Sequence, residues 1–176
     1  TLEPTSGRVK RGKTVRIGVL DQQFSQLADI GGDRVREVLA RTKTTFTIDG
    51  KDHTPAQLLE RLGFAREHLS ARVADLSGGQ KRRLQLLLLL LSEPNVIALD
   101  EPTNDLDMDT LDMLEAMLTA YKGTLIIVSH DRDFLDQTVS KILAFEGDGK
   151  VEGVIGGYSD YLEKVKGRKE EKPAEI

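Results

Sequence analysis

Leu76-Ser77-Gly78-Gly79-Gln80 is followed by a leucine-dense run and then by Val96-Ile97-Ala98-Leu99-Asp100-Glu101-Pro102-Thr103. Ser77, with Gln80 three residues later, fits a capping box and predicts a helix start. Glycines at such a start let backbone N–H groups approach an anion, and a helix N-terminus favours negative charge. The stretch therefore predicts a phosphate-binding turn that leads into a buried, leucine-rich helix over residues 81–91.

The second part of this stretch predicts a short buried strand, Val96 to Leu99, that ends in two acids. An apolar run of this length is typical of a parallel strand, and Pro102 stops it. Open α/β sheets bind their ligands at the carboxyl ends of the strands, where Asp100 and Glu101 stand. One carboxylate can hold Mg²⁺ through water, and the other can orient or deprotonate a water molecule.

Length and composition narrow the class of protein. The 176 residues make about one domain with a real core, and the net charge of −4 gives no global basic field for nucleic acid. The absence of cysteine excludes disulfides and thiolate metal sites, and it fits a cytoplasmic protein. The longest apolar run, Leu86 to Leu91, is too short to cross a bilayer, so we expect no membrane segment.

Residues 7–14 match the literal pattern of a phosphate-binding loop, G-x-x-x-x-G-K-T. That motif requires a hydrophobic strand before it and a helix that opens at the Lys-Thr pair. Here a polar lead-in precedes the pattern, and the alternating segment Thr14 to Leu20 follows it. We therefore interpret the segment as a β-hairpin, with strands around Arg8–Lys10 and Thr14–Leu20, and not as a nucleotide-binding loop.

Leu-Ser-Gly-Gly-Gln, followed about two dozen residues later by an apolar strand that ends Asp-Glu-Pro-Thr, resembles the signature and Walker B motifs of ATP-binding-cassette (ABC) ATPases. The resemblance covers about residues 7–162. It implies a P-loop NTPase fold of the α/β class. The expected parts are a β-hairpin leading to the Q-loop in residues 1–24, a helical subdomain in 25–80, an α/β core with a parallel sheet in 81–162 and a charged tail in 163–176. Within the helical subdomain, we expect residues 42–51 to be an irregular crossing.

This resemblance also implies ATP and Mg²⁺ as ligands and assigns the catalytic roles. Asp100 would hold Mg²⁺ through water, and Glu101 would be the general base. Gln22, with Gln23 as the alternative, would contact Mg²⁺ and sense the γ-phosphate. His130, at the end of a second buried strand over residues 124–129, resembles the switch histidine that hydrogen-bonds the γ-phosphate.

In the family, two cassettes pair head to tail, and each signature loop closes on ATP held by the other. The resemblance therefore assigns nucleotide contacts at the partner's site to Ser77, Gly78, Gly79 and Gln80. It places the D-loop, Asn104 to Asp107, across the interface, with Asp107 among the nucleotide-binding residues. The basic turn Lys81 to Arg83 stays open between phosphate or RNA contact and a solvated helix start. The true phosphate loop (Walker A) would lie before Thr1, so we expect the chain alone to bind ATP poorly and hydrolyse it negligibly.

The sequences of two loops resemble those of the soluble, tandem-cassette ABC-F branch. The D-loop reads Asn104-Asp105-Leu106-Asp107, where transporter cassettes usually read Ser-Ala-Leu-Asp, and the switch region reads Val128 to Asp136. Residues 145–158 look most like the second cassette of Uup-like proteins. This implies ATP hydrolysis that drives a conformational change on the ribosome, a second ABC domain of the same protein as partner, and DNA contact through a further C-terminal domain. The alternatives are a membrane transporter's ATPase subunit, a nucleic-acid-associated ABC ATPase and a non-enzymatic binding module.

Overall fold

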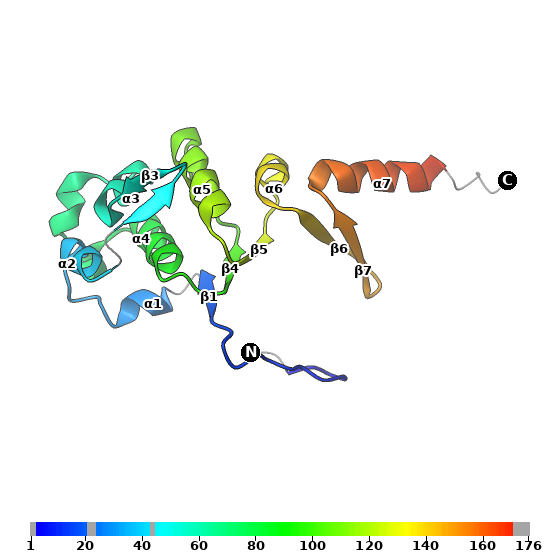
Figure 1. The fold of residues 1–176 in the computed structure, drawn as a ribbon, viewed down its shortest axis with the longest axis horizontal. Coiled ribbons are helices and arrows are strands. Elements are labelled where there is room, and N and C mark those ends of the chain that lie inside the picture. The colour runs from blue at the N-terminus through cyan, green and yellow to red at the C-terminus, as the bar shows by residue number, and fades with distance from the viewer. Residues whose placement is uncertain (1–2, 21–23, 43–44, 171–176) are drawn as a thin grey trace.

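A parallel sheet lies in the middle of the molecule (Figure 1). The computed structural model describes residues 3–20, 24–42 and 45–170. Three strands pair in the order β1 (Ile17–Leu20), β4 (Val96–Asp100) and β5 (Thr124–Val128), all parallel. Leu20 pairs with Leu99, and Asp100 pairs with Val128, so the carboxyl ends of the strands meet at one edge. The predicted α/β class with a parallel core sheet is confirmed.

A group of short elements covers one side of this sheet (Figure 1). Its members are α1 (Ser25–Ala28), α2 (Val35–Ala40), β2 (Phe46–Ile48), β3 (Lys51–His53), α3 (Pro55–Arg61) and the 3₁₀ turns Arg66–Ser70 and Val73–Asp75. Strands β2 and β3 form an antiparallel hairpin, so the irregular crossing expected over residues 42–51 is wrong. The hairpin forms because Phe46 and Ile48 bury their side chains in the main core.

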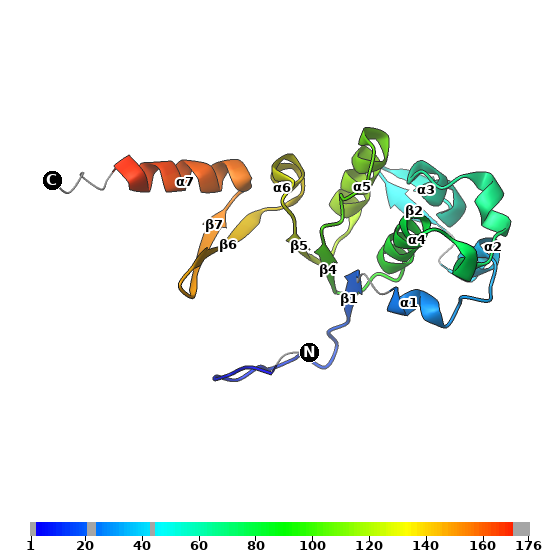
Figure 2. The same cartoon turned by 180° about the vertical axis from the view of Figure 1, so that it is seen from behind.

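The other end of the molecule carries a hairpin and a long helix, as both views show (Figures 1 and 2). After α5 (Met108–Ala120) and α6 (Arg132–Thr138) come the antiparallel strands β6 (Lys141–Gly147) and β7 (Lys150–Ile155), and then α7 (Tyr158–Glu170). Lys164 and Arg168 each place a nitrogen 2.6 Å from Glu152 Oε1. These ion pairs tie α7 to the hairpin, which explains why the charged segment continues as helix as far as Glu170.

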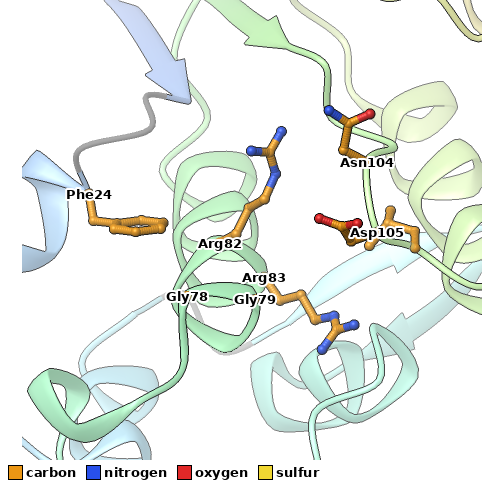
Figure 3. A pocket seen from close by; sticks show the side chains of 8 residues that line it. Phe24, Gly78, Gly79, Arg82, Arg83, Asn104 and Asp105 are labelled. Atoms are coloured by element: carbon orange, nitrogen blue, oxygen red, sulfur yellow. The ribbon is translucent and has the colours of Figure 1, made fainter.

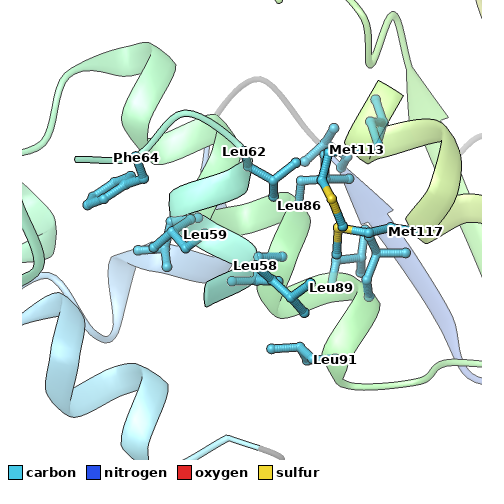
Figure 4. Packing of buried hydrophobic residues seen from close by; sticks show 14 of the residues in the cluster. Leu58, Leu59, Leu62, Phe64, Leu86, Leu89, Leu91, Met113 and Met117 are labelled. Atoms are coloured by element: carbon cyan, nitrogen blue, oxygen red, sulfur yellow. The ribbon is translucent and has the colours of Figure 1, made fainter. Parts of the chain in front are cut away.

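Helix α4 (Gly78–Leu91) is buried along most of its length. Leu84, Leu87 and Leu90 have no exposed surface, and α4 packs against α1, α3 and β1. Figure 4 shows its leucines interleaved with Leu58 and Leu62 from α3 and with two methionines of α5. The expectation that the leucine-dense helix is core is confirmed.

Glycine is required at position 18 because β1 and α4 approach each other closely there. A Cβ added to Gly18 would lie 2.3 Å from Leu89 Cδ1 and 3.1 Å from Pro94 Cγ. Both neighbours are buried, so neither has room to move aside. Gly18 therefore lets the leucine helix lie directly on the edge strand of the sheet.

The β-hairpin predicted in the N-terminal segment is wrong. Residues 8–10 carry no strand, the second predicted strand begins only at Ile17, and this strand pairs in parallel with β4. The segment is exposed throughout, and its Val9 side chain is 76% exposed, so the expected first strand has no apolar surface to bury. No helix opens at Lys13, which confirms that residues 7–14 do not form a nucleotide-binding loop.

Strand β5 was expected to be buried, and this is wrong for one of its faces. Ile126 and Val128 are 54% and 56% exposed, whereas Leu125 and Ile127 pack against the core. The strand lies at the edge of the sheet, and the described helices cover one face only. Alternate residues of a strand point to opposite faces, so a continuous apolar run alternates between covered and open positions here.

We expect Leu90→Ala to lower the free energy of unfolding by about 3 kcal/mol, because it removes a fully buried side chain and leaves a cavity. Urea denaturation of the chain measures this loss. The matched control is Leu88→Ala, two residues away on the same helix, where the side chain is only partly buried. Equal losses for the two variants would contradict the packing described for α4.

Acidification should loosen α7. Hydrogen bonds from Lys164 and then Arg168 lower the pKa of Glu152 from its usual 4.5. The folded state favours the charged carboxylate. The ion pairs that attach α7 to the β6–β7 hairpin are therefore complete above pH 4.5 and are lost as the pH falls through the lowered pKa of Glu152. Hydrogen exchange of the α7 amides at several pH values measures it. In Glu152→Gln, the same amides should exchange faster at neutral pH and lose this pH dependence, and unchanged protection would contradict the role of the ion pairs.

Candidate functional site

Glu101 follows β4 at the carboxyl edge of the sheet, and its backbone is held from two directions. Its N–H donates to the Val128 carbonyl at 2.8 Å, and its own carbonyl accepts from the Asn104 N–H at 3.3 Å. Its φ of +46° lies in the left-handed region, which residues other than glycine rarely adopt. Such conformations persist only where the surroundings determine them, and they cluster at functional sites.

The Glu101 side chain meets His130, the other predicted catalytic residue. The two side chains approach to 3.5 Å between Oε1 and Nε2, and the His130 N–H donates to Oε2 at 3.4 Å. The Glu101 side chain is 21% exposed, whereas the His130 imidazole is 97% exposed. Within the described residues, Oε1 is buried and accepts no hydrogen bond. A partly exposed carboxylate that is held beside an imidazole can act as a general base.

Asp100 ends β4 with an exposed side chain, beside Glu101. Across residues 3–20, 24–42 and 45–170, no three His, Cys, Asp or Glu side chains form a cluster that could hold a metal ion. Mg²⁺ is usually bound by one or two carboxylates together with water and substrate phosphates, so this acidic pair fits Mg²⁺ that arrives with a nucleotide. Gln22 and Gln23, predicted to contact the ion, lie outside the described residues.

The turn before α4 forms the predicted capping box. Ser77 Oγ accepts from the Gln80 N–H at 3.2 Å, and Gln80 Oε1 accepts from the Ser77 N–H at 2.9 Å. Gly78 and Gly79 open the helix, and a Cβ at either position would have no atom within 4 Å. First-turn amides have no acceptor within the helix, so the amides of Gly78 and Gly79 are available to a ligand. The arrangement can receive an anion, while the Gln80 carboxamide is already engaged in the cap.

A cavity of about 340 Å³ joins this helix start to the loop that follows β4 (Figure 3). Its lining residues are Phe24, Gly78, Gly79, Arg82, Arg83, Asn104, Asp105 and Leu106. Arg82 extends between Phe24 on one side and Asn104 on the other. Two motifs that are separate in the sequence, the signature and the D-loop, therefore share one cavity.

Arg82 makes contacts that the sequence did not reveal. Its Nη2 donates to the carbonyl of Asp100 at 3.0 Å and also to the carbonyl of Glu101. Its Nε is buried. The only signal was the basic turn Lys81 to Arg83, for which a solvated helix start was one alternative, and that alternative is wrong for Arg82.

Asp107 caps helix α5 and does not line the cavity. Its Oδ1 accepts from the Thr110 N–H at 2.8 Å. Hydrogen bonds from the Thr110 side chain and then its backbone lower the pKa of Asp107, and the charge of Arg83 adds to the effect. The structure thus gives this predicted nucleotide-binding residue a capping role at the end of the D-loop.

The sequence is similar to those of known proteins. Residues 2–104 match the family described as "ABC transporter". The chain is 44% identical to the ABC transporter ATP-binding protein YfmR of Bacillus subtilis, 38% to the ATP-binding protein Uup of Escherichia coli and 37% to the energy-dependent translational throttle protein EttA of Haemophilus influenzae. These matches cover 98%, 90% and 92% of the chain, which spans 28%, 25% and 29% of the respective relatives. The predicted resemblance to Uup-like proteins is confirmed.

Solved structures share the fold. An archaeal ribosome recycling factor, aABCE1, in complex with a ribosomal stalk protein, superposes with a TM-score of 0.67 at 23% identity over 94% of this chain and 32% of its own. A dimeric ATP-binding cassette bound to ADP and Pi gives a TM-score of 0.53 at 21% identity, over 81% of this chain and 64% of its own. At these identities, the likeness supports the predicted ABC fold alone. None of the helices in the described residues has the length and apolar content needed to cross a membrane.

Two capping boxes in this chain allow a matched test of the signature turn. Ser77 caps α4 beside the cavity, and Thr54 caps α3 with the same geometry, its Oγ1 accepting from the Gln57 N–H at 3.2 Å. We expect Ser77→Ala and Thr54→Ala each to lower the free energy of unfolding by about 1 kcal/mol in urea denaturation. A negligible loss for Ser77→Ala beside a normal loss for Thr54→Ala would contradict the cap at α4.

Proposed function

The chain belongs to the ABC transporter family of ATP-binding proteins, and from this premise we propose that it is part of an ABC-F type ATPase. The reaction is hydrolysis of ATP to ADP and phosphate at a composite site between two cassettes, and it drives a conformational change on the ribosome in the cytoplasm. The observation that supports this best is the Glu101–His130 pair at the carboxyl edge of β4, where Arg82 of the signature helix donates to the Glu101 carbonyl.

The proposed roles are those that the family resemblance implies, and the geometry of the acidic pair supports the roles of Glu101 and His130. Glu101 orients the attacking water and accepts its proton at its carboxylate, which is partly exposed and lies beside His130. His130, exposed and next to that carboxylate, donates a hydrogen bond to the γ-phosphate. Asp100 holds Mg²⁺ through water, with Gln22 as the second contact. When bound, Mg²⁺ offsets the charge on the transferring phosphoryl group, and positioning supplies most of the remaining catalysis.

The proposed partner is a second ABC domain of the same protein, arranged head to tail. Ser77 and the open amides of Gly78 and Gly79 then hold ATP that is bound by the partner, and the loop from Asn104 to Asp107 lies at the interface. The shared cavity of the signature turn and this loop supports the arrangement, because one approaching surface meets both. Under this proposal, residues 1–176 alone turn over ATP negligibly, since no P-loop helix opens after Thr14.

The ribosome is the proposed target because one relative is named a translational throttle protein. The chain spans 29% of that relative, so the activity and the target of the full-length protein to which this chain belongs are proposals. RNA contact follows from the same proposal, and DNA contact would belong to a further C-terminal domain.

Glu101→Gln in the full-length protein tests the proposal. It removes the base and keeps the shape of the side chain, so ATP turnover should fall by about 100-fold or more while ATP stays bound. Phosphate release measures turnover, and filter binding measures retained ATP. In sedimentation at physiological salt, this variant should pellet with ribosomes in ATP and remain in the supernatant without it.

The matched control is Glu163→Gln, the same change at an exposed position of α7, which should leave turnover at the wild-type level. The 176-residue chain alone is a second control and should release almost no phosphate. Tight ATP retention without pelleting would reject the ribosome and favour a transporter subunit or a nucleic-acid-associated ATPase. Wild-type turnover by Glu101→Gln would reject the assigned base.

A further inference from the structure

We propose that Arg82 is a positioning residue for ATP hydrolysis, which fixes the Asp100–Glu101 turn against helix α4. This inference rests on the proposed function. Arg82 lines the cavity beside Gly78 and Gly79, and in this proposal it acts through the backbone that carries the two carboxylates. It would thereby link the signature helix of the chain to the chain's own hydrolytic residues.

The contact is specific in its geometry. A single nitrogen, Arg82 Nη2, donates to two consecutive carbonyls, those of Asp100 and Glu101. Hydrogen bonds from a charged donor are about twice as strong as neutral ones. The Nε of this side chain is buried without a hydrogen-bond partner within the described residues, so Nη2 provides the polar contacts that hold the guanidinium at the turn. Both carbonyls lie at the end of β4, and the Glu101 carbonyl also accepts from the Asn104 N–H at 3.3 Å, so the guanidinium adds a charged donor to a turn that the following loop already holds.

Arg82 completes a set of anchors on one peptide segment. Glu101 is held by the Val128 carbonyl from β5, by the Asn104 N–H from the following loop and by Arg82 from α4. The left-handed φ of Glu101 needs such support, because the conformation is unfavourable for a residue with a Cβ. Without Arg82, the carbonyl side of the turn loses its only charged anchor within the described residues, and the carboxylate loses its fixed distance to His130.

The position of Arg82 on α4 gives the anchor a second consequence. It is five residues after Ser77, on a helix whose remaining turns are locked in the core. A displacement of the signature turn therefore carries Arg82 with it, and Arg82 carries the carbonyls of Asp100 and Glu101. Contact between the signature turn and the partner's ATP would in this way set the position of the base that serves the chain's own ATP.

The test uses Arg82→Gln in the full-length protein, with steady-state ATPase kinetics. Misplacement of a catalytic group by about 1 Å can cost about 100-fold, so we expect kcat to fall 10- to 100-fold. The KM for ATP should change less than about threefold, because the nucleotide contacts are untouched. Arg82→Lys keeps a charged nitrogen and should restore part of kcat. Arg36→Gln, the same change at an exposed position of α2, is the control and should keep wild-type kcat.

A double variant separates positioning from a general structural role. If Arg82 acts through Glu101, adding Arg82→Gln to Glu101→Gln should cause no further loss in single-turnover hydrolysis. An additional loss of the full 10- to 100-fold would overturn the inference, as would an unchanged kcat in Arg82→Gln or equal losses in the Lys and Gln variants. A wild-type protein without ATPase activity would instead overturn the proposed function, and this inference with it.

Discussion

The burial of helix α4 is the constraint on which the rest of the structure depends. Fully burying one leucine side chain contributes about 1.5–3 kcal/mol, and α4 carries six buried leucines. They fill the space between the parallel sheet and the short helices, so the side chains of one helix belong to the hydrophobic core of both parts. Gly18 permits this by letting Leu89 lie directly over β1. Because the later turns of α4 are packed in the core, its N-terminal turn is held next to the end of β4.

That turn faces a strand end that is itself under strain. Glu101 is left-handed, Pro102 is buried behind it, and no sheet partner continues beyond β4. The favourable contacts that hold this turn come from β5, from the following loop and from Arg82. The unfavourable conformation is thus offset by the surrounding fold, and it gives Glu101 Oε1 a buried position beside His130. Stability in the core supports a strained geometry at the site.

The sequence predicted the features that depend on short-range rules. The capping box of Ser77 and Gln80, the leucine helix and the strand ending in Asp100 follow from patterns a few residues long. The β2–β3 hairpin was missed because its burial depends on a distant core, and the open face of β5 was missed because periodicity does not show which face is covered. Arg82 was ambiguous for the same reason: its partners lie 18 and 19 residues away. Nothing in its neighbourhood in the sequence specifies them.

Element length explains why these distant partners meet. Helix α4 has 14 residues and advances about 21 Å away from the signature turn at 1.5 Å per residue. Strand β4 has 5 residues and returns about 16 Å at 3.3 Å per residue, so its carboxyl end comes back to the level of the first or second turn of the helix. Arg82 is the fifth residue of α4, at that level. The signature and the acidic pair therefore come together because a helix and a strand of matched length follow each other in opposite directions, joined by the short connection over residues 92–95.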